Sequence, residues 1–398
     1  MTNTVNKVTI YTNTLDELVR ANLASARLEA GAGRYQYNGG NTVKIPKLTV
    51  GGYGTYNRST GYPSGSVTNE WETKTITMDR GIKFGFDIMD QDETQQVLSA
   101  SNAISVFAKT KAVPELDSYR FSSIFNAILP GTTVRYGYYT PAAANLLTQL
   151  NTQIGAIQDV VGETEPLICF ISGSAFTILT NSTELTKQLG VQNVTGANGV
   201  TTKIYDINGV TLIPVPSARM KTEYAFSATD GFSAKTWAQD INFMIMSPNA
   251  AIAFVKHNQT KIISAAANQT SDEELVMSRV YHDIWVLDNK KETIYVSLKT
   301  ATIDDISSLL TAGSGKVTYT LGTAYTNKDT GHEYWYKNTA SATAPTVPAC
   351  YDDFATAGYT KIATASATDV TVTATHYLVL AHLDENGKVV EFGKVAAS

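Results

Sequence analysis

The sequence predicts an α+β protein with a small all-β C-terminal domain, and three patterns carry this prediction. Residues 82–88 alternate apolar and polar, as a half-buried strand does. Between residues 97 and 128 the apolar positions recur at a spacing near 3.6, which is typical of a helix with one buried face. After residue 300 a Thr- and Ala-rich β pattern continues to the end of the chain. Strands and helices therefore occupy separate stretches, as in the α+β class.

Composition limits the possible partners. The chain has 398 residues, enough for two or three domains, and only 17% of them are charged, against about 25% in an average soluble domain. The formal net charge is −5, so no overall basic field exists to hold nucleic acid. Any nucleic acid near the protein is expected to be enclosed by it rather than bound through a basic surface.

No stretch approaches the 18 or so uninterrupted apolar residues that a membrane span needs, and the first residues lack the pattern of a secretory signal. We therefore expect no membrane partner and synthesis in the cytoplasm. Cys169 and Cys350 lie far apart in the chain, so we expect no disulfide framework.

Residues 1–40 are predicted to form an N-terminal arm with one short helix at 14–30, where Thr14 caps the helix and Glu17 completes a capping box. Residues 41–88 are predicted to form an extended loop with its return strand. A strand at 41–50, whose Pro46 confines it to an edge, leads to a Gly- and Tyr-rich tip and back along 66–80, giving a two-stranded ribbon of roughly 35 Å.

The return strand changes character along its length. From Trp71 to Arg80 neither of its faces is apolar, whereas Ile82–Ile88 has a clear apolar face. A two-stranded ribbon alone is marginally stable in water. The sequence therefore predicts that the ribbon is buried against a surface supplied from elsewhere, such as another subunit.

Residues 89–138 are predicted to contain one long helix. Asp90, Asp92 and Glu93 place negative charge at its start, and the pattern continues to Leu129, about 58 Å at 1.5 Å per residue. Pro114 should kink this helix because proline removes a helical hydrogen bond.

Residues 139–299 are predicted to be a compact α/β region. We expect a helix that opens at Thr140-Pro141, a buried strand in LICFIS, a helix over 174–188, a strand pair in KIYDING and VTLIPVP, and strands in the two apolar runs after residue 240. The turn-like LDNKKE suggests a hairpin at 287–292.

Residues 300–398 are predicted to be a linker followed by an accessory all-β domain that folds on its own, with an immunoglobulin-like arrangement as one option. DENG is the expected turn of its last hairpin.

Catalytic motifs are scarce. The five histidines show no zinc-binding spacing, and each is expected to be a surface or half-buried residue. Asp87, Asp90, Asp92 and Glu93 could bind a cation, but a charged helix start explains them better. We therefore expect no enzyme activity, no cofactor and no metal.

The tip carries the aromatic residues Tyr53, Tyr56 and Tyr62, and Arg58 is its single basic residue. Nucleic-acid stacking would need more positive charge, whereas Tyr and Arg are enriched in protein interfaces. A protein contact is therefore the better interpretation.

The order of these segments resembles the major capsid proteins of tailed bacteriophages with the Hong Kong 97-like fold. The resemblance rests on NTVKIPKL, the tyrosine-rich tip, the return strand WETKTITMDRGIKFGFDIMDQDET, the long helix with VPELDSY, and SPNAAIAFVKH and SRVYHDIWVLDNKKETIYV, and it covers about residues 1–300. It implies an extended loop, a peripheral domain with a spine helix, and an axial domain.

By this resemblance the chain would form the hexamers and pentamers of an icosahedral virion capsid that encloses double-stranded DNA non-specifically. Ile82 would mark where the arm joins its own body. The residues that would contact a neighbouring subunit are Tyr53, Tyr56, Arg58, Tyr62, Trp71, Lys74 and Arg80. No long charged helical segment precedes residue 14, so assembly would need a separate scaffolding protein or none. A portal protein is a further expected partner, and the C-terminal domain is expected outside the shell.

Two alternatives stay open. An encapsulin-like bacterial compartment would share the fold but hold cargo enzymes. A metal-dependent enzyme that uses Asp87, Asp90 and Glu93 is the more distant one.

Overall fold

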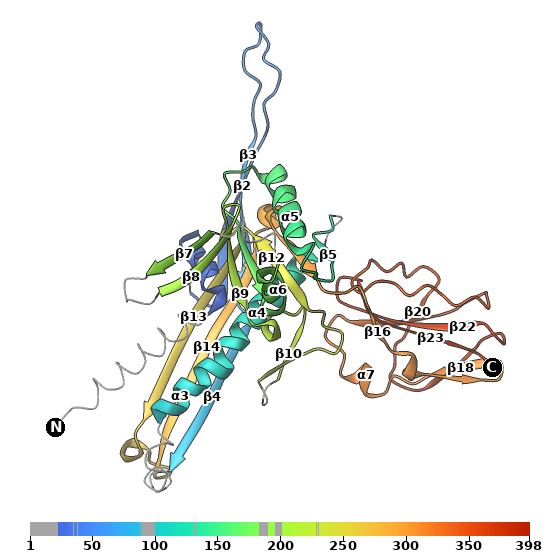
Figure 1. Cartoon of the computed structure of the whole chain (residues 1–398). Helices are drawn as coiled ribbons and strands as arrows, with labels where there is room; N and C mark the ends of the chain where they lie inside the picture. Colours follow the sequence, from blue (N-terminus) through green and yellow to red (C-terminus); the bar gives the residue numbers. More distant parts are fainter. Residues whose placement is uncertain are drawn as a thin grey trace.

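The computed structural model describes residues 23–34, 36–37, 39–87, 89, 100–130, 133–182, 190–195, 201–227, 229 and 231–398. Figure 1 shows a central body, an arm that projects from it at the top, a long narrow sheet that extends in the opposite direction, and a β-rich C-terminal region to one side.

The body is built on a seven-stranded mixed sheet in the order β5-β15-β12-β6-β9-β8-β7. β6 lies near the middle, parallel to β9 and antiparallel to β12. The expected strand pair in KIYDING and VTLIPVP is confirmed, and its turn uses Asn208 and Gly209, both with positive φ. The strands are β5 Tyr136–Tyr138, β6 Ile168–Ser172, β7 Gly190–Thr195, β8 Thr201–Ile207, β9 Val210–Val215, β12 Ile241–Met246 and β15 Tyr295–Leu298.

Helices cover this sheet on both faces, which explains why LICFIS is apolar throughout. Ile168 and Phe170 of β6 belong to the same core cluster as the buried side of helix α4, whereas Cys169 and Ile171 pack with α5 and α6. A strand buried on both faces reads as a continuous apolar run. The helices are α4 Val113–Ile128, α5 Leu146–Val161 and α6 Gly173–Thr180.

The long sheet has three antiparallel strands in the order β13-β14-β4, and it carries α3 and α4 on one side. Phe84 and Phe86 of β4 pack with Ile104 of α3, so the apolar alternation read from the sequence is confirmed at these positions. β14, with 14 residues, is about 46 Å long at 3.3 Å per residue. The elements are β4 Met78–Asp87, α3 Ala100–Phe107, β13 Ala251–Ile263 and β14 Glu273–Val286.

The expected disturbance of the long helix at Pro114 takes the form of a π-turn over Ala108–Ala112 that joins α3 to α4. Val113 donates its N–H to the carbonyl of Ala108, five residues back. Because Pro114 has no N–H, the wider turn places it near the start of α4, where a missing donor costs little.

Three local expectations need correction. The helix expected from Thr140-Pro141 begins at Leu146, because the chain at Tyr139 still pairs with Leu298 of β15. LDNKKE is not a hairpin: η6 Asp288–Thr293 carries the chain from β14 in the long sheet to β15 in the body sheet. The helix expected over 174–188 ends at Thr180, and residues 183–189 lie outside the described part.

The predicted N-terminal helix is only partly described. Thr14 and Glu17 lie outside the described residues, and η1 Ala24–Arg34 is a 3-10 helix. It is fixed to α4 by Asp117, whose carboxylate accepts hydrogen bonds from the backbone and hydroxyl of Ser25 at 3.1 and 2.8 Å.

The C-terminal region forms two sheets, β16-β23-β22-β19-β20 and β17-β18-β21, which face each other across one apolar cluster. The expected hairpin turn at 384–387 is confirmed between β22 and β23. The strands are β16 Asp304–Asp305, β17 Leu310–Gly313, β18 Lys316–Tyr319, β19 Glu333–Asn338, β20 Thr360–Lys361, β21 Thr368–Thr371, β22 Tyr377–Leu383 and β23 Val389–Ala396. An immunoglobulin-like arrangement of these strands stays a prediction.

The start of this region is not the linker that the sequence predicted. Residues 304–313 already belong to β16, η7 (Ser307–Leu309) and β17, and β16 pairs with β23. Cys350, Tyr351, Val389 and Phe392 also share a single core cluster with α4 and the body sheet. The C-terminal region is thus packed onto the body rather than tethered to it.

Candidate functional site

The arm is an antiparallel ribbon of β2 Thr42–Val50 and β3 Val67–Thr75, paired in register from Thr42 opposite Thr75 to Val50 opposite Val67. Near the body a third short strand, β1 Gln36–Tyr37, joins β2. Only the base of the arm is anchored: Val43, Ile45 and Ile76 are buried in a cluster with Phe254 and Trp285. Beyond Ile45 the arm stands clear of its own body (Figure 1).

The register gives the arm one apolar face. Residues directly opposite each other in an antiparallel pair project to the same side, so Pro46 and Trp71 share a face, as do Val50 and Val67. Leu48 lies between these pairs, opposite Asn69, which is the polar residue of this outer part of the face. Exposed fractions are 60% for Leu48, 63% for Val50, 68% for Val67 and 49% for Trp71. The return strand from Trp71 to Thr75 has no apolar face of its own, as expected, and the apolar face of the arm comes mainly from β2.

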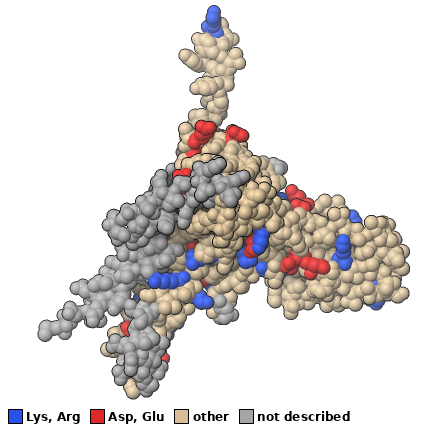
Figure 2. Space-filling model, in the orientation of Figure 1, with Lys and Arg blue, Asp and Glu red and all other residues tan. Residues whose placement is uncertain are grey.

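The opposite face of the arm is charged. Lys47 lies opposite Glu70 in the register, and Lys74 forms an ion pair with Glu72 at 2.6 Å. The tip, in contrast, carries Arg58 as its single basic residue. Figure 2 accordingly shows the upper part of the arm almost without charge apart from basic atoms at the end.

At the tip, all four predicted contact residues are exposed. Tyr53 is fully exposed and Tyr62 is 89% exposed, and the rings of Tyr56 and Tyr62 meet edge-to-face with centroids 5.1 Å apart. Arg58 is exposed as well. The turn is closed by paired hydrogen bonds between the backbones of Asn57 and Gly61. The aromatic tip is thus a preformed surface with no cover from its own chain.

Arg80 is not part of this surface. Its guanidinium forms an ion pair with Glu115 of α4 at 2.5 Å and donates to the carbonyl of Ser227 at 2.6 Å. It therefore holds β4 against the body. Of the seven predicted contact residues, the structure places six on the arm and one inside its own subunit.

The arm joins the body at residues 76–77, not at Ile82 as expected. Ile76 is 3% exposed, and Thr77 donates both its N–H and its hydroxyl to the carboxylate of Asp283, at 2.9 and 3.0 Å. Asp283 also accepts the hydroxyl of Tyr119 at 2.7 Å. Ile82 is 37% exposed in β4. The chain changes sheets between β3 and β4, and this polar anchor fixes the point of change.

Of the four acidic residues considered as a metal site, Asp87 alone lies in the described part of the chain. Asp87 accepts the backbone N–H of Met89 at 2.8 Å, as a local cap does, and Asp90, Asp92 and Glu93 lie outside the described residues.

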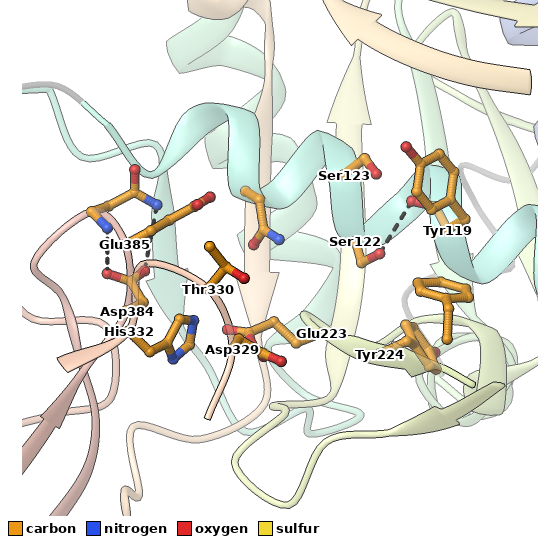
Figure 3. A pocket seen from close by; sticks show the side chains of 13 residues that line it. Tyr119, Ser122, Ser123, Glu223, Tyr224, Asp329, Thr330, His332, Asp384 and Glu385 are labelled. Atoms are coloured by element: carbon orange, nitrogen blue, oxygen red, sulfur yellow. Dashed lines mark hydrogen bonds between the residues drawn. The ribbon is translucent and has the colours of Figure 1, made fainter. Parts of the chain in front are cut away.

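Sequence reasoning missed a polar cavity of about 220 Å³ between the body and the C-terminal region. Glu223, Asp329 and His332 line it, and Figure 3 shows their side chains converging. Burial raises the pKa of Glu223 to about 7, although hydrogen bonds from Trp237 and Tyr351 oppose the shift. Burial also lowers the pKa of His332 to about 4, so its ring is neutral at pH 7.

Three histidines are more buried than expected. His282, His332 and His382 are 2%, 7% and 0% exposed. The β pattern around these histidines, in which they alternate with aromatic residues, does not predict their burial, because a histidine on a strand fits either a solvent-exposed or a buried face. Both cysteines are buried and free.

No protein-family model and no curated protein matches the chain. Solved structures do. The mature capsid of bacteriophage PhiM1 is similar at 14% identity and a TM-score of 0.47, over 66% of this chain and 82% of that chain. The capsid of the cyanophage P-SCSP1u gives 11% and 0.46, over 66% and 84%. The SrpI encapsulin of Synechococcus elongatus gives 8% and 0.39, over 59% and 78%.

Capsid structures of tailed phages are thus among the structural neighbours, as the resemblance in the sequence predicted. The sequence identities to these three structures are 14% or less, and the TM-scores lie below 0.5. In the described part of the chain, no helix has the length and apolarity needed to cross a bilayer.

Proposed function

We propose that the chain is a structural subunit of a closed protein shell, and that its arm lies across a neighbouring copy. The observation that carries the proposal is the apolar face of the arm, formed by Pro46, Leu48, Val50, Val67 and Trp71. A ribbon that is apolar on one side and covered by nothing of its own chain is unusual in a protein that works alone.

The energetics favour a protein cover. Fully burying a side chain the size of Leu or Val contributes about 1.5–3 kcal/mol. Each arm presents five such positions, and a shell repeats the contact for every subunit. Weak overlaps then add up to a cohesive lattice, while a single subunit stays soluble because the opposite face carries Lys47, Glu70, Glu72 and Lys74.

An arm that reaches from one copy to the next makes a head-to-tail contact. Such contacts close into rings when the rotation between copies allows it. The hexamers and pentamers of an icosahedral virion capsid are rings of this kind, and the resemblance to tailed-phage major capsid proteins favours them here.

The proposed content of the shell is double-stranded DNA. A portal protein would give access to this DNA, and the shell would assemble with a separate scaffolding protein. Support comes from the charge, because a net charge of −5 suits a wall that encloses DNA without gripping it. The encapsulin-like compartment is the alternative, and the contents separate the two: nuclease-resistant DNA in purified particles supports the capsid, and a cargo protein without DNA supports the compartment.

We also propose that the C-terminal region faces outward, because a DNA-filled interior has little room for an added domain. Intact particles should then yield to protease or antibody within residues 304–398. Protection of this region until the particles are broken would place it inside.

The intersubunit role is tested by one matched pair of variants. Leu48→Lys places a charge on the apolar face of the arm, and Thr49→Lys places the same charge on the opposite face one residue away. Both positions are exposed, so both subunits should fold. We expect Leu48→Lys to lose most assembled particles in sedimentation and electron microscopy, and Thr49→Lys to retain them. Equal assembly of the two variants would refute the role of the apolar face.

A further inference from the structure

The cavity at the junction of the body and the C-terminal region brings together three side chains that could hold a metal ion. Glu223 comes from the body, directly before β10 (Tyr224–Phe226), and Asp329 and His332 come from the loop that leads into β19. One ligand atom from each of the three lies within 4.8 Å of the others. Figure 3 shows the three side chains close together, between Asp384 and Glu385 on one side and Ser122 and Tyr224 on the other.

A buried relay sets the proton position on His332. In the neutral tautomer of His382 that donates from Nδ1 to Glu391, at 2.7 Å, Nε2 is left as an acceptor. Nδ1 of His332 lies 3.1 Å from that Nε2 and therefore carries its proton toward it. Nε2 of His332 is then unprotonated and offers its lone pair.

This arrangement is the one that metal-binding histidines use, because a second ring nitrogen held by a hydrogen bond fixes both the tautomer and the ring. His332 is 7% exposed and lines the cavity. Among the described residues, its Nε2 has no hydrogen-bond partner. A histidine side chain that is more than nine-tenths buried, lines an acidic cavity and keeps one ring nitrogen unpaired is the observation that points to a cation.

The two carboxylates are held in a similar way. Glu223 accepts the indole N–H of Trp237 at 2.6 Å and the hydroxyl of Tyr351 at 3.0 Å, which orient its oxygens. Asp329 accepts Lys235 at 2.5 Å on one oxygen, and the other oxygen remains for a ligand.

The charge around the cavity is also negative. Its lining contains four acidic residues, Glu223, Asp329, Asp384 and Glu385, and no Lys or Arg; Lys235 pairs with Asp329 from outside the lining. Burial also raises the pKa of Asp384, although hydrogen bonds from Lys388 and Asn386 and the charge of Lys388 oppose the shift.

We propose that Glu223, Asp329 and His332 bind a divalent transition-metal ion of the zinc class. One imidazole nitrogen and two carboxylate oxygens suit such an ion, whereas calcium and magnesium prefer oxygen ligands alone. A water from the cavity would complete the four positions, and 220 Å³ leaves room for it. Because one ligand belongs to the body and two to the C-terminal region, the ion would fasten the two together.

The test uses the full-length, untagged subunit after dialysis against a chelator, with zinc as the probe. We expect one zinc ion per chain by mass spectrometry and a rise of the melting temperature on zinc addition. Cobalt in place of zinc should give a visible absorption band from a nitrogen- and oxygen-bound ion.

Two variants assign the site. Asp329→Asn and His332→Gln should each weaken zinc binding by at least about tenfold, because changing even the hydrogen-bond partner of a metal ligand costs about 10–100-fold. Glu385→Gln, an exposed acid on the same cavity, is the matched control and should bind zinc as the parent does. Each variant is compared with itself, with and without zinc, so that a change in its baseline stability does not matter.

Asp329→Asn lies on a half-exposed loop and keeps the test alive if His332→Gln fails to fold. Zinc binding that is unchanged in Asp329→Asn, or no melting shift in the parent at 0.1 mM zinc, would overturn the proposal. The Lys235–Asp329 ion pair would then be the whole function of the cluster.

Discussion

The arm and the junction between the body and the C-terminal region show opposite patterns of burial. The arm exposes apolar side chains, Leu48 and Trp71 among them, that nothing in the subunit covers. The junction buries polar side chains, and each is held by a partner: Tyr351 by Thr222 and Glu223, His382 by Glu391. Exposed apolar surface indicates a contact with another molecule, and satisfied buried polar groups indicate a permanent contact within one.

Removing the C-terminal region is expected to have the largest effect on the subunit. Ending the chain after Lys299 would uncover Phe125, Tyr136 and the rest of the cluster that packs on Tyr351. Several core side chains at about 1.5–3 kcal/mol each exceed the stability of a typical domain. We therefore expect an insoluble or partly unfolded subunit, measured by circular dichroism and size exclusion.

Deleting the tip between Gly51 and Ser66 is the matched control for that truncation, since it removes no buried side chain. The shortened arm should leave a folded, soluble subunit that no longer forms stable particles. A soluble, cooperatively melting subunit after truncation at residue 299 would show that the C-terminal region is an independent domain after all.

Acidification should weaken the body and spare the arm. Burial lowers the pKa of His282 to about 3 from an ordinary value of 6.5, and Arg120 and Arg80 nearby add to the shift. The unfolded chain therefore takes up a proton below pH 6.5 that the folded chain refuses. The stabilising effect is complete above that pH and is lost at about 1.4 kcal/mol per pH unit as the pH falls toward 3.

Urea unfolding at pH 6, 5 and 4 measures this loss. His282→Gln should have a shallower pH dependence than the parent, whatever its stability at pH 7. The same slope in both proteins would remove His282 as the cause.

The hydroxyl of Tyr351 tests how much the buried hydrogen bonds stabilise the junction. Tyr351→Phe keeps the ring, which lies 5.1 Å from that of Phe125, and removes the hydrogen bonds to Thr222 at 2.8 Å and Glu223 at 3.0 Å. Leaving a buried carboxylate with one donor fewer costs about 1–3 kcal/mol. Chemical denaturation should show this loss.

The control for that change is Tyr359→Phe. Tyr359 is half-buried against Phe354, and among the described residues its hydroxyl has no hydrogen-bond partner. We expect a change below about 0.5 kcal/mol, as for substitutions away from buried networks. Equal losses in the two variants would mean that the hydroxyl of Tyr351 contributes nothing specific.

The smallest effect is expected on the charged face of the arm. Lys74→Ala removes an ion pair with Glu72 whose partners are 31% and 21% exposed. Exposed pairs contribute about 0–1 kcal/mol, so neither subunit stability nor particle yield should change measurably. A loss of particles would show that the charged face takes part in the contact.

Much of this architecture could be predicted from local patterns. The alternation at Phe84 and Phe86, the apolar run of β6 and the helical spacing of α4 each reflect neighbours close in sequence. The hairpin nature of the arm followed from two β-forming stretches around a Gly-rich tip.

What failed depends on register and on distant partners. The apolar face of the arm exists only because Trp71 pairs with Pro46 and Val67 with Val50, and no single strand reveals that pairing. The junction joins Tyr136 and Tyr138 to the backbone carbonyls of residues 350–351, more than 200 positions away. The Thr-rich composition after residue 300 does not predict that one edge of the C-terminal region packs into the core of the body.

The central claim is that the apolar face of the arm becomes buried when subunits assemble, and thiol labelling measures this directly. Leu48→Cys should react rapidly with a maleimide in the free subunit, while Cys169 and Cys350 stay unreactive because both are buried. In assembled particles we expect the same cysteine to be protected by at least about tenfold. Equal labelling of Leu48→Cys in particles and free subunits would contradict the account.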